Sequence, residues 1–293
     1  MDESTRARLL KMQRMEATEA EVYKRLAKMQ SDPVNRSILE GISLEEERHE
    51  AAIEKLTGEK VSADSRKVRK QVFLARVFGF TFSVKMMEAT EQDAAAEYRE
   101  LGLHEIADEE EAHEQNMIEM LDEERLRYSG SVVLGMSDAL VELTGALAGL
   151  TFALQNLRLV ALAGLVTGIA AAFSMGASEY LSSRAEKKSE SPLKAAFFTW
   201  ISYLLTVLLL VSPYLMFHSD SAELLGFEPF VQALACTFAI GLIIIAVFNF
   251  YVSVVEDVSF KSRFLEMAAI LGVVSLISYG IGILLRGFLG VEV

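Results

Sequence analysis

Two short acidic segments of the chain occur twice, and each contains side chains of the kinds that bind metal ions. The sequence MEATE at residues 15–19 recurs at residues 87–91, and EEERHE at residues 45–50 is matched by EEEAHE at residues 109–114. In both copies of the second segment a glutamate precedes a histidine by three residues, so the pair shares one face of a helix. Carboxylates bind Fe²⁺ and Fe³⁺, and imidazole suits the borderline Fe²⁺ ion. The repeat therefore predicts a di-iron carboxylate site, whose ligands are glutamates and Glu-x-x-His pairs from four helices.

Four helices are expected to position these side chains. Residues 3–127 are rich in helix formers, and the breaks between helices are marked by Asp32, Pro33, Gly58 and Gly102. An aspartate cap followed by proline begins a helix, whereas glycine commonly ends one. The expected helices lie near residues 3–30, 33–57, 67–101 and 103–127. The first repeated segment then falls on the first and third helices, and the second repeated segment falls on the second and fourth.

This region resembles the rubrerythrin-type ferritin-like domains over nearly all of residues 3–127. The resemblance implies a ferritin-like four-helix bundle whose di-iron centre reacts with O₂ or H₂O₂, with Mn or Zn as substitutes for iron. The metal ligands that it implies are Glu16, Glu46, His49, Glu88, Glu91, Glu110 and His113. Glu19 is a symmetry-related further ligand, and the run of glutamates at 45–47 leaves the register open by one residue. Because Cys236 is the only cysteine, the chain lacks the Cys-rich electron-delivery module of rubrerythrins.

The second part of the chain is too apolar for an ordinary water-soluble domain. Residues 1–128 hold 20 Lys/Arg and 29 Asp/Glu, whereas residues 129–293 hold 8 and 12. About 20 apolar residues suffice to cross a bilayer. Five windows qualify, near residues 131–156, 159–183, 195–217, 230–255 and 264–286. The sequence thus predicts an all-α protein, with a soluble domain at 1–128 and a five-helix transmembrane domain at 129–293.

The loops between these windows predict how the protein is oriented in the cell membrane. Six basic residues fall on the side that holds the N-terminal domain: Arg184, Lys187, Lys188, Lys194, Lys261 and Arg263. The opposite side has only Arg158 and Arg286. Because basic loops remain in the cytoplasm, the N-terminal domain is expected there. Five spans then place the C-terminus across the membrane.

Several carboxylates lie within the predicted spans. Asp138 and Glu142 are four residues apart and share a helix face, and Glu179 and Glu266 lie in other spans. A carboxylate at mid-membrane costs about 2.5–3.5 kcal/mol on insertion scales, so it needs a partner or an aqueous path. The carboxylates therefore suggest a route for cations. Glu179 and Glu266 fit equally well at helix ends, near lipid headgroups.

Two segments of this part resemble the vacuolar iron transporters. Residues 135–149 (GMSDALVELTGALAG) are similar to the first span of that family, and residues 172–181 (AFSMGASEYL) are similar to the second. The resemblance implies a homodimer that moves Fe²⁺ against protons, along a path lined by Asp138 and Met175. Thr167 occupies a position where the family often has glutamate, and Glu142 is the candidate replacement.

Joined in this order, the two halves resemble the membrane-bound ferritins, which are fusions of an erythrin domain to a vacuolar iron transporter domain. The leading hypothesis is a Fe²⁺ exporter with a path through Asp138, Glu142, Met175 and Glu179. The alternatives are a membrane-anchored di-iron ferroxidase or peroxidase and a Mn²⁺ exporter. The net charge of −13 argues against nucleic acid as a partner. The unusually apolar residues 72–84 fit either a dimer interface or a contact with the membrane.

Overall fold

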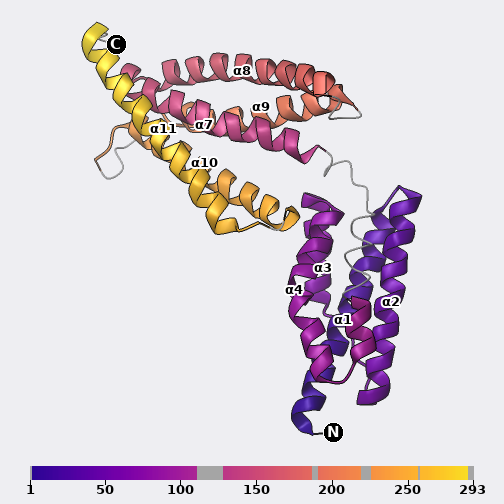
Figure 1. Ribbon diagram of the computed structural model, residues 1–293. Helices are drawn as coiled ribbons and strands as arrows, with labels where there is room; N and C mark the ends of the chain where they lie inside the picture. The colour runs from indigo at the N-terminus through magenta and orange to yellow at the C-terminus, as the bar shows by residue number, and fades with distance from the viewer. Residues whose placement is uncertain (1, 111–127, 187–190, 219–225, 257, 290–293) are drawn as a thin grey trace. The chain divides into compact units, whose positions relative to one another are not determined.

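The computed structural model describes residues 2–110, 128–186, 191–218, 226–256 and 258–289, apart from the side chains of residues 88–94 and 186. These residues form helices and connecting segments, which confirms the prediction of an all-α protein (Figure 1). They fall into two compact units, one formed by the helices before residue 111 and one by the helices after residue 128. Each unit is described by itself.

The N-terminal unit begins with two long helices, α1 (Glu3–Met29) and α2 (Pro33–Thr57), which pack against each other. The predicted break between them is confirmed. The side chain of Asp32 accepts hydrogen bonds from the backbone N–H groups of Val34 and Asn35, at 2.7 and 3.0 Å, with Pro33 in the first turn. Gly58 ends α2 in the left-handed conformation that glycine adopts without strain.

The single third helix expected over residues 67–101 is wrong, because the chain turns back on itself at Gly79. Two helices replace it, α3 (Ser65–Phe78) and α4 (Phe80–Glu100), which lie side by side (Figure 1). The hydroxyl of Ser83 donates to the backbone oxygen of Gln71 at 3.1 Å, a contact that one straight helix forbids. Gly79 has φ 102° and ψ 157°, a region open essentially to glycine alone. Gly102 breaks the chain again as predicted, and residues 104–110 are helical.

The core of this unit contains two separate apolar clusters. One includes Val22, Leu26, Leu39, Ile42 and Phe80, and the other includes Leu9, Met12, Ile53, Tyr98 and Ile106. The predicted metal ligands of α1 and α2 lie between the residues that belong to these two clusters. Part of the apolar segment 72–84 is used inside the unit, since Phe80, Phe82 and Val84 are buried. Phe73 and Val77 in the same segment are exposed.

In the second unit, the described residues include five helices that are long and apolar enough to cross a membrane. They are α7 (Ser129–Leu154), α8 (Leu157–Glu186), α9 (Pro192–Met216), α10 (Pro229–Val255) and α11 (Phe260–Leu289). At about 1.5 Å per residue each is longer than the roughly 30 Å hydrocarbon core of a bilayer. Their bounds match the predicted windows to within a few residues.

Helix α7 lies at the centre of the second unit, in contact with α8, α9 and α11. Glycines allow two of these close approaches. A Cβ on Gly149 of α7 would lie 2.9 Å from the backbone oxygen of Ser278 on α11, and a Cβ on Gly164 of α8 would lie 2.8 Å from the side chain of Leu147 on α7. Small residues at crossings let helix backbones pack closely, as is usual in membrane bundles.

Candidate metal sites

Four of the predicted metal ligands come together in the N-terminal unit. Glu16 of α1, Glu46 and His49 of α2, and Glu110 each offer one ligand atom, and these atoms lie within 4.8 Å of one another. Glu16, Glu46 and His49 are buried, and Glu110 is half-buried. We call these four residues the Glu/His cluster. Three helical segments that are distant in sequence therefore contribute to one site.

The ligand atoms of the Glu/His cluster converge on Nδ1 of His49. That atom lies 2.9 Å from Oε1 of Glu110, 3.6 Å from Oε2 of Glu16 and 3.7 Å from Oε2 of Glu46. All four atoms are buried, and within the described part of the chain none makes a hydrogen bond of regular geometry. Buried polar atoms are normally satisfied, because leaving one unpaired costs about 1–3 kcal/mol. Three carboxylate oxygens and one imidazole nitrogen that face each other in this way can hold a metal ion.

The outward atoms of the cluster are held by further hydrogen bonds. Nε2 of His49 lies 3.0 Å from a carboxylate oxygen of Glu109, which also binds Arg48 at 2.6 Å. The hydroxyl of the fully buried Tyr98 donates to Oε1 of Glu16. When a carboxylate accepts from the outer N–H of a histidine, the other ring nitrogen is free to bind metal. Both ligands are thus oriented toward the centre of the cluster.

Burial and the neighbouring charges change the pKa values of these groups. Burial raises the pKa of Glu16 well above its ordinary value, and the neighbouring carboxylates of Glu46 and Glu110 raise it further. Burial also raises the pKa of Glu110. Burial acts to lower the pKa of His49, but the surrounding carboxylates outweigh it and raise that pKa to about 12. The cluster therefore binds protons that compete with a cation for the same atoms.

Of the other predicted ligands, the structure describes the side chain of Glu19 alone. Glu19 is half-buried on α1 and lies outside the group whose ligand atoms converge. His113 and the side chains of Glu88 and Glu91 lie outside the described residues. Sequence reasoning missed Tyr98 and Glu109 as supporting residues. The only signal for Glu109 was its place in the glutamate run, and nothing in the sequence distinguished Tyr98 from core aromatics.

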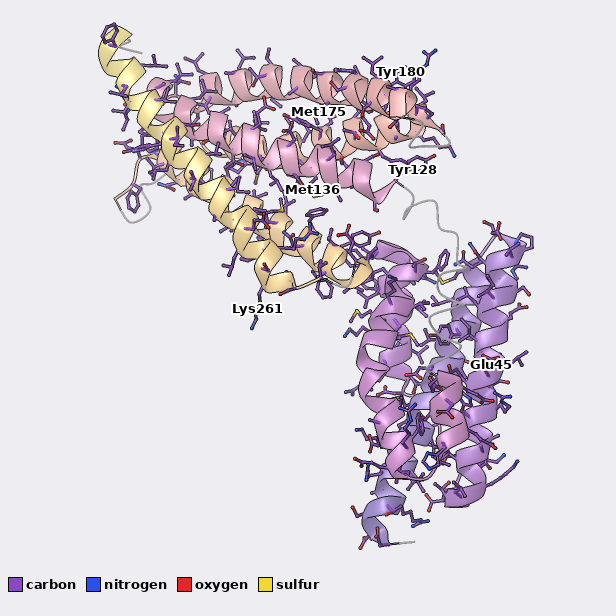
Figure 2. All side chains as sticks on the ribbon, in the orientation of Figure 1. Glu45, Tyr128, Met136, Met175, Tyr180 and Lys261 are labelled. Atoms are coloured by element: carbon purple, nitrogen blue, oxygen red, sulfur yellow. The ribbon has the colours of Figure 1, made fainter. Side chains whose placement is uncertain are left out.

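The predicted transport residues lie on α7 and α8. Asp138 is half-buried, and the exposed Glu142 accepts a hydrogen bond of 2.9 Å from the hydroxyl of Tyr203 on α9. Met175 of α8 packs against the apolar core of the unit, as does Met136 of α7 (Figure 2). Tyr203 was not predicted, because a tyrosine in an apolar span resembles any other packing residue.

Glu179 and Thr167 of α8 have local partners. An oxygen of Glu179 accepts from the hydroxyls of Ser131 on α7, at 2.9 Å, and Ser183, at 3.2 Å. Thr167 is exposed, and its hydroxyl donates to the backbone oxygen of Ala163 at 2.8 Å, one helical turn earlier. Glu179 thus links α8 to the start of α7, and Thr167 offers no carboxylate.

Comparison with known proteins identifies one part of the chain. Residues 129–191, which cover α7, α8 and the segment that leads to α9, match the model of the VIT family. No curated protein matches the chain. The matched segment contains Asp138, Glu142, Met175 and Glu179. The N-terminal helices are therefore followed by a segment similar to a family of membrane metal transporters.

Proposed function

We propose that this protein exports Fe²⁺ across the cell membrane and that its N-terminal bundle binds the iron in the cytoplasm. The observation that carries the proposal is the Glu/His cluster, with its four inward-facing ligand atoms, in the same chain as a segment similar to the VIT family. A cytoplasmic carboxylate site and an acidic membrane path in the same chain give one cation a site for capture and a route for exit.

In the bundle, the carboxylates of Glu16, Glu46 and Glu110 supply the negative charge for a cation, and His49 supplies a nitrogen ligand. The repeat in the sequence adds Glu88, Glu91 and His113 as ligands of a second ion, which would make a di-iron centre. Bound iron would contribute electron transfer to O₂ or H₂O₂. The protein itself holds the ligands in place through Tyr98 and Glu109, and buries them away from bulk water.

In the membrane domain, Asp138, Glu142, Met175 and Glu179 are proposed to line the path. The hydroxyl of Tyr203 fixes one oxygen of Glu142 and leaves the other for a cation or proton. Carboxylates bind Fe²⁺ and can exchange it for protons, and the thioether of Met175 is a soft ligand that suits Fe²⁺ better than Fe³⁺. We propose a homodimer that exchanges protons for Fe²⁺.

The orientation follows from the charge of the loops and is part of the proposal. A reporter fused before residue 2 is expected in the cytoplasm, and one fused after residue 293 is expected across the membrane. If both reporters are found on the same side, the assignment of five spans and the direction of transport fail together.

A second candidate is a membrane-anchored ferroxidase or peroxidase. It is favoured by the fact that Glu16, Glu46, His49 and Glu110 all belong to the N-terminal unit, so the site needs no residue from the spans. The spans would then serve only as an anchor. A third candidate is Mn²⁺ export, because three carboxylates and one imidazole also suit Mn²⁺.

Metal uptake by sealed vesicles that contain the purified protein tests these candidates. Asp138→Asn keeps the shape of the side chain but removes its charge, and Met175→Leu keeps the volume but removes the sulfur. Each should reduce Fe²⁺ flux while iron binding by the bundle is unchanged. The matched controls are Glu266→Gln, an exposed carboxylate on α11, and Met216→Leu, an exposed methionine at the end of α9.

The result separates the candidates. An anchored enzyme oxidises Fe²⁺ but shows no flux in the wild type, whereas a Mn²⁺ exporter shows flux with Mn²⁺ in preference to Fe²⁺. Full Fe²⁺ transport by the double variant of Asp138 and Met175 would contradict the proposed path. Glu142→Gln should also reduce flux if this residue replaces the carboxylate absent at Thr167.

A further inference from the structure

Helix α3 has an exposed face on which basic and large apolar side chains alternate. The positions that face solvent are three or four residues apart, so they form one stripe along the helix. We call it the α3 stripe, and its members are Arg66, Arg69, Lys70, Phe73, Arg76 and Val77. The opposite side of the helix holds the buried residues Val68 and Ala75. One face of α3 therefore packs in the bundle, and the other face is in contact with solvent.

The apolar part of the stripe is exposed to an unusual degree. Phe73 is 63% exposed and Val77, one turn further along, is 50% exposed. Single exposed apolar residues are common on protein surfaces. Two exposed apolar residues one turn apart, surrounded by basic side chains, are typical of helices that lie in the membrane interface. In such helices the apolar side chains enter the boundary between headgroups and acyl chains.

The charge of α3 is opposite to that of the rest of the N-terminal region. Residues 65–78 contain five basic residues and no acidic residue, although residues 1–128 as a whole carry a net charge of −9. The basic residues are placed at both sides of Phe73, with Lys70 before it and Arg76 after it. The many carboxylates of this domain already keep it soluble. The basic residues of α3 are therefore not needed for solubility.

We propose that the α3 stripe binds the surface of a bilayer that contains anionic lipids. Phosphate and carboxylate headgroups complement the four cations of the stripe, and Phe73 and Val77 provide the apolar contact that a purely electrostatic attraction lacks. This contact would hold the N-terminal unit at a bilayer surface. The inference stands on the surface of α3 and is independent of whether the spans transport metal.

A second copy of the chain is a poorer occupant of this surface. A two-fold symmetric dimer through α3 would place the same stripe on both sides of the contact. Four cations would then face four cations, and neither α3 helix carries an acidic residue. Such a contact is repulsive, whereas an anionic bilayer attracts every basic residue of the stripe.

A fluorescent label on α3 in the full chain tests the proposal. Because Cys236 is the only cysteine, Cys236→Ser with Val77→Cys gives one site for an environment-sensitive nitrobenzoxadiazole label. The protein is placed in nanodiscs of phosphatidylcholine alone or mixed with phosphatidylglycerol, at one or at two copies per disc. The matched control is Leu56→Cys on α2, which is 52% exposed and has no cationic stripe around it.

We expect the label at position 77 to brighten and shift to shorter wavelength only in discs that contain phosphatidylglycerol. High salt should reverse the change, because ionic strength screens exposed charges. Each basic residue near an anionic surface contributes about fivefold to binding, so Arg69→Glu with Lys70→Glu should weaken the contact by at least about 25-fold. Lys28→Glu with Lys55→Glu changes the net charge equally at exposed positions elsewhere and should have no effect.

Two results would overturn the proposal. Equal fluorescence in both kinds of disc would show that α3 does not respond to anionic lipid. A change that depends on the number of protein copies per disc, and not on the lipid, would assign the stripe to a second copy. Circular dichroism of each variant shows whether the bundle remains folded, and the label at position 56 reports any general change in the domain.

Discussion

Replacing Glu46 by glutamine should make the metal-free bundle more stable and the metal-bound bundle less stable. Glu46 is buried on α2, and its Oε2 lies in the centre of the Glu/His cluster, 3.7 Å from Nδ1 of His49. Glutamine keeps the size of the side chain and removes one negative charge. The negative charge of Glu46 destabilises the bundle when three carboxyl groups share one imidazole. The same charge stabilises the bundle when a metal cation is bound.

The structure provides the magnitudes. Two ionised carboxylates about 4 Å apart repel by about 4 kcal/mol at an effective dielectric constant near 20. Bound protons already relieve most of this repulsion, because burial raises the pKa of Glu16 and of Glu110. We therefore expect Glu46→Gln to stabilise the metal-free state by on the order of 1 kcal/mol.

The metal-bound state should respond in the opposite direction. A metal at about 100 times its Kd stabilises the fold by about 2.7 kcal/mol, which lowers the population of open states about 100-fold. Substituting a residue that only hydrogen-bonds to a metal ligand weakens metal binding by up to roughly 100-fold. Loss of the ligand Glu46 itself should weaken metal binding by at least as much. At the same metal concentration, metal then lowers the population of open states of the variant by at most about twofold.

Hydrogen exchange of α1 and α2 in the full chain measures both effects. Amide exchange is compared with a chelator and with anaerobic Fe²⁺, in the wild type and in Glu46→Gln. Glu40→Gln is the control, because it removes the same charge from an exposed position on α2. Equal protection by metal in Glu46→Gln and wild type would refute the assignment of the cluster as a metal site.

Other predictions concern the support of the site, its pH dependence and the packing of the spans. Tyr98→Phe should leave the helices intact but weaken metal binding about 10–100-fold in chelator competition, since the hydroxyl that orients Glu16 is lost. Because burial raises the pKa of Glu16, metal binding should release protons, and affinity should increase with pH in titrations followed by an indicator dye. Gly149→Val places a side chain against the backbone of Ser278 and should cost about 1–3 kcal/mol, seen as a lower melting temperature in detergent. Gly272→Ala on α11, where a Cβ meets nothing within 4 Å, is the control and should change little.

Much of the fold follows from local patterns in the sequence. The five long apolar helices were predicted to within a few residues, because apolar windows of that length are typical of helices long enough to cross a bilayer. The break at Pro33 was also predicted, because its cap and proline act within one turn. Gly79 was missed. It lies in an apolar run without other turn residues, and only the packing of α3 against α4 distinguishes a reversal from a straight helix.

The candidate site was predicted in part for the same reason. The repeated segments pointed to Glu16, Glu46, His49 and Glu110, because an internal repeat can be recognised in the sequence without knowledge of the fold. Tyr98 and Tyr203 could not be recognised, because each acts through one hydrogen bond to a carboxylate on another helix. Such pairings depend on which helices meet, and a single sequence does not give this information.

The reversal at Gly79 separates two helices that would otherwise join into one longer helix. If residue 79 became helical, α3 and α4 would form one helix of about 36 residues, roughly 54 Å long. Its second half could then reach its place only in the bundle of another molecule, which is the geometry of domain swapping. Any residue with a Cβ disfavours the present backbone conformation at this position. We therefore expect a side chain at position 79 to favour the longer helix, and with it the exchanged dimer, over the present reversal.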